Sequence, residues 1–157
     1  MLRHHINPDH YLLGPDGRRV WSEERGKAAW ELAYAELEHS LKMLGPRGTL
    51  FIVCGLQGAG KSTWIERNGA SHGPTALFFD AALPSRKHRV RALGLAAASA
   101  TPAVAVWINV PIETALARNA LRSGDERIAE ETIRHVLGLL EAPSVGEGFR
   151  EVIEVND

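Results

Sequence analysis

Four short apolar runs, each bounded by turn or polar residues, recur through the chain after residue 48. The first three are almost continuously apolar, which is typical of strands buried on both faces of a parallel sheet. The fourth has the length of a strand. The predicted strands are Thr49–Cys54, Thr75–Asp80, Ala103–Val110 and Glu151–Val155.

The segments between these runs carry helix start and stop signals. Ser85 can cap one helix, Pro111 stands at a tolerated early position of another, and Gly69 can end a third. Strands that alternate with helices predict an α/β fold, with a mostly parallel sheet covered on both faces. The predicted helices are Ser62–Asn68, Ser85–Ser99, Pro111–Arg122 and Ala129–Glu141.

The N-terminal segment, residues 1–48, has a different pattern. Turn signals dominate residues 1–20, at Asn7–Asp9 and Gly14–Gly17. Apolar residues then recur at spacings of three or four, which predicts one amphipathic helix over Ser22–Leu44. Its apolar face comprises Trp30, Ala33, Leu37, Leu41 and Leu44.

The chain has 157 residues, 45% hydrophobic and 24% charged, which predicts one globular domain over residues 1–157. A formal net charge of −1 argues against a broad basic footprint for duplex nucleic acid. A single cysteine excludes an intramolecular disulfide and fits a reducing compartment. We find no signal peptide and no run of ~18 apolar residues that could span a membrane, so we expect a cytoplasmic protein.

The residues after the first predicted strand fit the pattern G-x-x-x-x-G-K-[ST] of a P-loop. Its glycines let successive backbone N–H groups face one concavity, and the following helix adds partial positive charge. Lys61 is suited to the β- and γ-phosphates of ATP, and the Ser62 hydroxyl to Mg²⁺. We therefore expect a three-layer P-loop NTPase fold with a sheet of about five strands. The predicted ATP-binding residues of the loop are Gly55, Leu56, Gln57, Gly58, Ala59, Gly60, Lys61, Ser62 and Thr63.

Asp80 ends the second predicted strand, at the edge where ligands bind in open parallel sheets. Its carboxylate can orient Mg²⁺ together with Ser62, or accept a proton from an acceptor hydroxyl as the general base. A turn or helix-capping role is the alternative.

Two groups of arginines are candidates for anion binding. Arg118 and Arg122 share one helix face before a flexible break, which predicts a lid near residues 118–130 that closes over the transferred phosphate. Arg86 and Arg89 lie in the first turn of the helix after the second strand and could hold an anionic acceptor. For both groups, a solvated helix face is the alternative.

Four stretches within residues 49–157 match one known group of proteins, and two of them contain runs more particular than the P-loop, R-N-x-x-R and E-A-P-x-x-x-E-G-F. They are GLQGAGKSTW, FFDAALPSRKHR, VWINVPIETALARNALR and LEAPSVGEGFREVIEV. Together they resemble the polynucleotide 5′-kinase branch of P-loop kinases, which includes zeta-toxin-like kinases. The resemblance implies ATP- and Mg²⁺-dependent phosphate transfer to a hydroxyl. It also implies that Arg122 is a lid arginine on the ATP phosphates, with Arg118 nearby, and that Pro143 lines the adenine pocket.

The chain departs from this group after the P-loop helix. There the group has a strand ending in Asn-Arg-Asp, whose aspartate is the general base, whereas only residues 69–74 precede the next strand here. Residues 4–9, followed by a helix, are similar to the missing piece, moved ahead of the P-loop as in a circular permutation. Asp9 would then be the base, and Pro8 stands where the group has its arginine. An unrelated N-terminal helical cap is the alternative.

Three functions remain open on these observations. The first is a kinase that phosphorylates the 5′ end of a short nucleic-acid strand. The second is a kinase for a small acceptor such as a nucleoside, a sugar or an antibiotic. The third is a regulatory module that binds ATP without transferring phosphate. In either kinase Lys61, Arg118 and Arg122 serve the phosphates, and Asp9 or Asp80 is the base.

Overall fold

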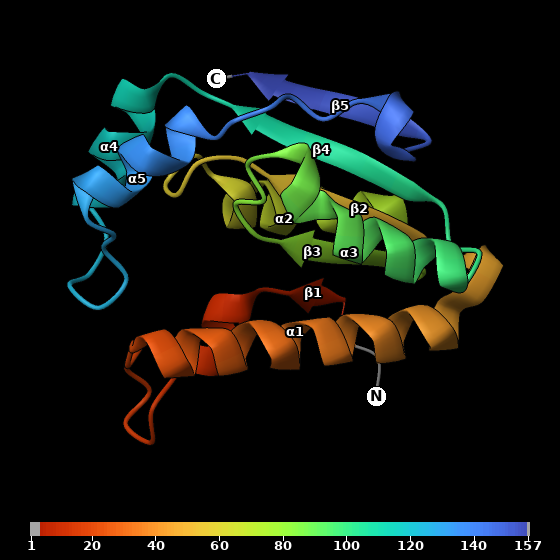
Figure 1. The fold of residues 1–157 in the computed structure, drawn as a ribbon, viewed down its shortest axis with the longest axis horizontal. Helices are drawn as coiled ribbons and strands as arrows, with labels where there is room; N and C mark the ends of the chain where they lie inside the picture. Colours follow the sequence, from red (N-terminus) through yellow and green to blue (C-terminus); the bar gives the residue numbers. More distant parts are fainter. Residues whose placement is uncertain (1–3, 157) are drawn as a thin grey trace.

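The computed structural model describes residues 4–156, in which five parallel strands form one sheet (Figure 1). The strand order is β1-β3-β2-β4-β5, so β2 lies at the centre. The strands are β1 (His5–Ile6), β2 (Thr49–Cys54), β3 (Ala76–Asp80), β4 (Ala103–Asn109) and β5 (Glu151–Asn156). The predicted α/β class and parallel sheet are confirmed.

Helices cover both faces of this sheet, which gives three layers. Helices α1 and α3 pack on one face, and α2, α4 and α5 pack on the other. The α-helices are α1 (Glu23–Leu44), α2 (Lys61–Asn68), α3 (Arg86–Ala98), α4 (Ile112–Ala120) and α5 (Glu130–Gly138). Short 3₁₀ turns are η1 (Pro8–Leu12), η2 (Gly45–Arg47), η3 (Gly69–His72) and η4 (Val145–Glu147).

Alternate residues of the central strand, β2, pack against the helices on opposite faces of the sheet. In β2, Leu50 and Ile52 pack in the core beneath α1 and α3, whereas Phe51 and Val53 pack in the core beneath α2, α4 and α5. All four are at most 5% exposed. A strand buried on both faces is apolar at every position, which explains the continuous apolar run in the sequence.

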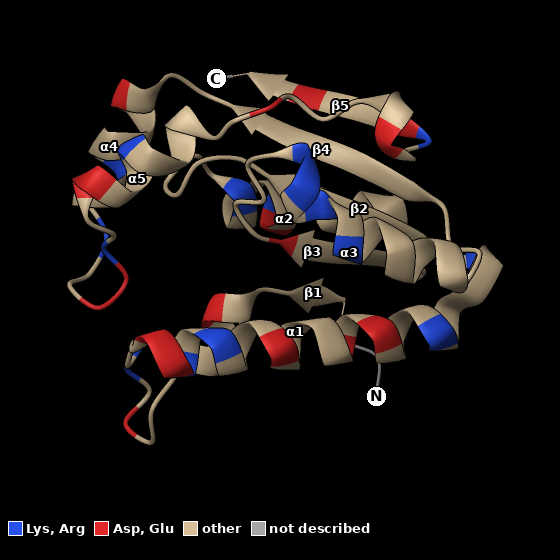
Figure 2. Cartoon of the chain, viewed as in Figure 1, with Lys and Arg blue, Asp and Glu red and all other residues tan. Residues whose placement is uncertain are grey.

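The amphipathic pattern of α1 is confirmed over most of its length. Ala33, Leu37 and Leu41 are fully buried against the sheet, and acidic and basic residues are interspersed along the helix (Figure 2). Trp30 differs from the prediction, because it is 37% exposed and borders a cavity instead of lying wholly in the core.

The N-terminal segment supplies the edge strand of the sheet. Strand β1 is parallel to β3, and Ile6 pairs with Phe79, one residue before Asp80. Parallel strands end at the same edge, so the residues after Ile6 lie beside Asp80. The Asn7 side chain then accepts a hydrogen bond of 2.9 Å from the Asp9 N–H, which begins η1 and holds Asp9 at this edge.

Predicted and observed element boundaries differ by at most three residues, the largest difference being at the end of α5, at Gly138 rather than Glu141. Among the described residues, no helix is long and apolar enough to cross a membrane.

Candidate functional site

The glycine-rich loop, Gly55–Thr63, connects the carboxyl end of β2 to α2. Gly58 has a φ of 85°, and a Cβ atom there would meet the carbonyl oxygen of Ala115 in α4. A Cβ atom on Gly55 would lie 2.7 Å from the carbonyl oxygen of Ile108 in β4. Glycine is therefore required at both positions, and the loop lies close against α4 and β4. The first N–H groups of α2 have no intrahelical partner and are available to an anion.

Lys61 begins α2, and its side chain folds back over the loop. Its Nζ donates hydrogen bonds of 3.0 Å to the Gly55 carbonyl and 2.9 Å to the Leu56 carbonyl. Burial lowers the pKa of Lys61, and the nearby Asp80 carboxylate opposes this shift. The ammonium group thus lies at the mouth of the loop, and its hydrogen-bond partners within residues 4–156 are two neutral carbonyl oxygens that a phosphate can replace.

Asp80 is the centre of a buried polar cluster between the loop and the N-terminal segment. One carboxylate oxygen, Oδ2, accepts a 2.5 Å hydrogen bond from the Ser62 hydroxyl and lies 2.9 Å from His5 Nε2. The same oxygen accepts a 3.3 Å hydrogen bond from Asn7 Nδ2. Three segments that are distant in sequence, β1, α2 and β3, therefore meet at one carboxylate.

The surroundings of Asp80 favour its charged form. Burial alone would raise the pKa of Asp80, but the hydrogen bond from His5, the charge of Lys61 and the hydrogen bond from Ser62 outweigh it. The pKa consequently lies below its ordinary value of 3.8, and the carboxylate is ionised at neutral pH.

The chemistry of these donors fits a magnesium ion. Mg²⁺ prefers oxygen ligands and commonly uses only one or two protein groups, completed by phosphates and water. Ser62 Oγ and the Asp80 carboxylate are adjacent oxygen donors of this kind. Among residues 4–156, no cluster of three or more His, Cys, Asp or Glu side chains forms a closed metal cage.

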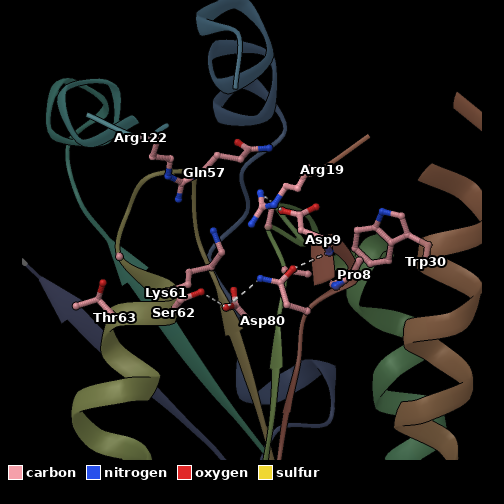
Figure 3. A pocket seen from close by; sticks show the side chains of 14 residues that line it. Pro8, Asp9, Arg19, Trp30, Gln57, Lys61, Ser62, Thr63, Asp80 and Arg122 are labelled. Atoms are coloured by element: carbon pink, nitrogen blue, oxygen red, sulfur yellow. Dashed lines mark hydrogen bonds and ion pairs between the residues drawn. The ribbon is translucent and has the colours of Figure 1, made fainter. Parts of the chain in front are cut away.

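A first cavity of about 250 Å³ opens above this cluster (Figure 3). The loop, the end of β3 and the N-terminal segment each contribute to its wall. Its lining comprises Asn7, Pro8, Asp9, Arg19, Trp30, Gln57, Gly60, Lys61, Ser62, Thr63, Asp80, Ala81, Ala82 and Arg122. The cavity thus brings together three predicted site residues, Lys61 of the loop, Asp80 of β3 and Asp9 of the N-terminal segment.

A second cavity of about 380 Å³ lies on the other side of the loop. It shares Gly60 and Thr63 with the first cavity, so the two meet at the start of α2. The remaining wall comes from α2, α4 and the carboxyl ends of β4 and β5. Its other lining residues are Ala59, Trp64, Arg67, Asn68, Ile108, Val110, Arg118, Val155 and Asn156.

The structure separates the two predicted lid arginines. Arg122 lines the first cavity, whereas Arg118 lines the second and donates a 2.6 Å hydrogen bond to the Ala59 carbonyl of the loop. Arg118 lies in α4, and Arg122 follows the end of this helix. Asn119 connects the end of α4 to Ile128, just before α5. The Asn119 amide donates to the Ile128 carbonyl at 2.6 Å and accepts from the Ile128 N–H at 2.9 Å.

The acceptor role predicted for Arg89 is corrected by its environment. Arg89 is 1% exposed, and its guanidinium group makes two hydrogen bonds of 2.8 and 3.0 Å with the Glu147 carboxylate and a third, of 3.0 Å, with the Leu83 carbonyl. It is a structural ion pair that joins α3 to the turn before β5. Arg86 is exposed and donates to the Gly146 carbonyl at 3.2 Å, and it lines neither cavity beside the loop.

Pro143, the predicted adenine-pocket residue, is buried beside Gly55, Arg89 and Trp107. It lines neither of the two cavities at the start of α2. The loop that carries Pro143 runs from α5 back to β5, so its position depends on packing that the sequence pattern does not show.

Sequence patterns also missed several residues of the site. His5 and Asn7 bond to Asp80, and Arg19 and Trp30 line the first cavity. Only the run His-x-Asn-x-Asp at the end of a short strand gave a signal, and it pointed to Asp9 alone. Arg19 follows a turn and Trp30 belongs to an amphipathic helix, where an arginine and a tryptophan are ordinary.

No protein-family model matches the chain, and no curated protein matches it in sequence. Its fold is similar to that of a sugar kinase from Janibacter sp. HTCC2649, whose crystal structure is unliganded. The sequence identity is 13% and the TM-score is 0.50, and the match covers 69% of this chain and 85% of that one. At this identity the likeness shows the fold alone. The resemblance to polynucleotide 5′-kinases stays a prediction.

Proposed function

We propose that the protein is an ATP- and Mg²⁺-dependent phosphotransferase that moves the γ-phosphate of ATP to a hydroxyl group of a small acceptor. The observation that carries this proposal is the pair of cavities that meet at Gly60 and Thr63 of the glycine-rich loop. Two substrates can then lie on opposite sides of the loop, with the triphosphate between them.

ATP lies in this proposal with its nucleoside in the second cavity, beside Trp64 and Arg118, and with its phosphates over the loop. Lys61 exchanges its two carbonyl partners for phosphate oxygens, which bind its charge more strongly. Ser62 and Asp80 hold the Mg²⁺ that neutralises the phosphate charge, and Arg122 adds charge stabilisation from the lid.

The first cavity then receives the acceptor. Its hydroxyl oxygen forms a bond to the γ-phosphorus as the bond from that phosphorus to the β–γ bridging oxygen breaks, and ADP leaves. The hydroxyl proton passes to a carboxylate. We assign that carboxylate to Asp9, because Asp80 Oδ2 already serves three partners. The Asp9 side chain is 48% exposed and borders the cavity.

The size of the first cavity favours a small acceptor. At about 250 Å³, it lies just below the ~300–1,000 Å³ typical of pockets for drug-sized ligands. A monosaccharide or a single nucleoside fits this space. The sugar kinase with a similar fold is compatible with this reading. A short nucleic-acid end would have to extend out of the cavity.

The decisive experiment measures transfer of labelled γ-phosphate from ATP by the full chain to a panel of acceptors. The panel contains nucleosides, sugars, 5′-hydroxyl RNA and 5′-hydroxyl DNA. We expect labelling of small acceptors, a loss of about 10²–10³-fold in Lys61→Ala, and a loss of about 10²–10⁴-fold in Asp9→Asn.

ATP binding by Asp9→Asn should remain, because Asp9 lies on the acceptor side. Glu24→Gln, an exposed change on α1, is the matched control and should leave transfer unchanged. ATP binding without transfer to any acceptor would support the regulatory module instead. Labelling of nucleic-acid ends alone would restore the polynucleotide kinase.

A further inference from the structure

The acceptor side of the first cavity is built by the segment that precedes the loop. Figure 3 shows Asp9, Arg19 and Trp30 together on one side of Lys61, with Gln57 and Arg122 on the other. Asp9 comes from η1, Trp30 from the first half of α1, and Arg19 from the connection between them. Arg19 and Trp30 have no part in the phosphate-side chemistry described above.

The backbone of Arg19 is fixed on both sides. It forms an antiparallel bridge with Leu13, and its N–H donates a 3.1 Å hydrogen bond to the Asp125 carboxylate in the turn between α4 and α5. These contacts hold the side chain at the cavity without using its charged end.

The guanidinium group of Arg19 is poorly satisfied where it lies. The side chain is only 19% exposed, and within residues 4–156 its charged end makes one hydrogen bond, of 3.4 Å, to Asp9 Oδ2. A guanidinium group has five N–H donors, and sheltering it from water is unfavourable unless they find partners. An anion in the cavity would supply these partners, because the planar guanidinium group can bind a phosphate or a carboxylate through two parallel hydrogen bonds.

Trp30 presents a flat apolar surface at the same wall. Its ring packs against Tyr34 and Phe79, with centroids 5.8 and 6.4 Å away, and this fixes its orientation. The residue nevertheless remains 37% exposed and lines the first cavity. A rigid, half-exposed indole next to Arg19 is suited to pack on the face of a ring.

We infer that Arg19 and Trp30 determine the specificity of the acceptor, which is a ring compound that carries both the reacting hydroxyl and an anionic group. Trp30 packs on the ring, Arg19 binds the phosphate or carboxylate of the acceptor, and Asp9 receives the hydroxyl proton. This inference rests on the proposed phosphotransfer. The anion is not the γ-phosphate, because Lys61 and Arg122 serve that group from the opposite side of the cavity.

Two sources share this chemistry, a sugar derivative and a nucleotide, and matched pairs of acceptors separate them. Glucose is compared with glucuronate, and adenosine with adenosine 3′-monophosphate, with kcat/KM measured for each. We expect the anionic member of one pair to be favoured by about ten- to hundred-fold, the range for hydrogen bonds to a charged group. The pair that shows the preference identifies the source.

Variants test the two residues separately. Arg19→Gln should reduce the ratio of anionic to neutral kcat/KM at least ten-fold, and Arg19→Lys should retain part of it. Arg18→Gln removes a charge at the neighbouring, exposed position and should change nothing. Trp30→Leu should raise KM about ten-fold for ring acceptors of either charge. The control Trp21→Leu, at a 71% exposed indole, should leave KM unchanged.

Two outcomes would overturn the inference alone. One is transfer by the wild type without preference in either pair. The other is an equal loss in Arg19→Gln with neutral and anionic acceptors, which would place Arg19 on the transferred phosphate or in the scaffold. Transfer to no member of either pair and to no acceptor of the larger panel, with ATP still bound, would remove the proposed function and this inference together.

Discussion

The two arginines that begin α3 show how much a single residue depends on its neighbours. Both follow Asp80 closely in sequence, and both were expected to bind the acceptor. Arg89 instead lies in the core, where it forms a bidentate pair with Glu147, and the two side chains are 1% and 2% exposed. Arg19, which sequence analysis passed over, lines the first cavity. Burial and partners, not position near a motif, decide which arginine is free to bind a ligand.

Removing one partner of the Arg89–Glu147 pair should destabilise the protein strongly, whereas replacing both partners with apolar residues should not. Arg89→Met or Glu147→Gln alone leaves a buried partner uncompensated, and should lower the free energy of unfolding by about 3–5 kcal/mol. The double variant Arg89→Met/Glu147→Met should recover most of that loss, because no buried charge remains. Urea unfolding of the single and double variants measures both quantities.

The exposed pair Arg91–Glu31, 52% and 67% exposed, provides the control. Arg91→Gln or Glu31→Gln should each cost about 1 kcal/mol or less, as for other surface pairs. Similar losses at the buried and exposed pairs would contradict the structural role assigned to Arg89.

At the scale of elements, the glycine-rich loop is defined as much by α4 and β4 as by its own residues. The pattern of glycine, lysine and serine identified the loop, and the strand and helix around it were predicted within a residue. The sequence did not show that Gly58 lies against the Ala115 carbonyl of α4. The contact fixes the loop relative to the helix that carries Arg118 and that ends just before Arg122.

Gly58→Ala should therefore weaken both stability and nucleotide binding. This substitution places a Cβ atom against the Ala115 carbonyl and also forces alanine into a positive φ. The substitution Gly73→Ala forces a positive φ as well, of 84°, but the space around Gly73 is open. We expect Gly73→Ala to cost about 1–2 kcal/mol. Gly58→Ala should cost more and raise the Kd for ATP at least ten-fold.

Unfolding curves and ATP titration of both variants check this expectation. Equal costs, with ATP affinity retained in Gly58→Ala, would show that the loop can move away from α4. Either result distinguishes a rigid loop from an adaptable one.

At the scale of the whole molecule, the N-terminal segment completes both the sheet and the site. It supplies edge strand β1, the α1 layer of the core, and one wall of the first cavity. This placement is compatible with a permuted acceptor-side element, which stays a prediction. Acidic and basic residues are mixed along α1 (Figure 2), in keeping with the net charge of −1.

The junction between the N-terminal segment and the loop should make stability sensitive to acid. Asp80 has a lower pKa in the folded protein than its ordinary 3.8, so its stabilising effect is present above that value and is lost as pH falls through the folded pKa. Asp80→Asn should lower the free energy of unfolding by about 1–3 kcal/mol at neutral pH. The two proteins should converge as the pH falls below 3.8.

Denaturant unfolding of both proteins from about pH 7 to about pH 2 measures this difference. A difference that stays constant over the whole range would show that the hydrogen-bonded shape of Asp80, and not its charge, stabilises the junction.

The sequence by itself determined the α/β class, the central strands, the glycine-rich loop and the position of Asp80 at the end of a strand. These features depend on local rules, because a strand buried on both faces is apolar throughout and a phosphate-binding loop needs its glycines and lysine together. Only the tertiary structure decided that Arg89 forms an ion pair in the core, that Pro143 lies away from both cavities, and that Arg19 and Trp30 line the first cavity. Those assignments depend on which segments distant in sequence pack side by side, and an arginine or a tryptophan has the same local pattern whether it binds a ligand or fills the core.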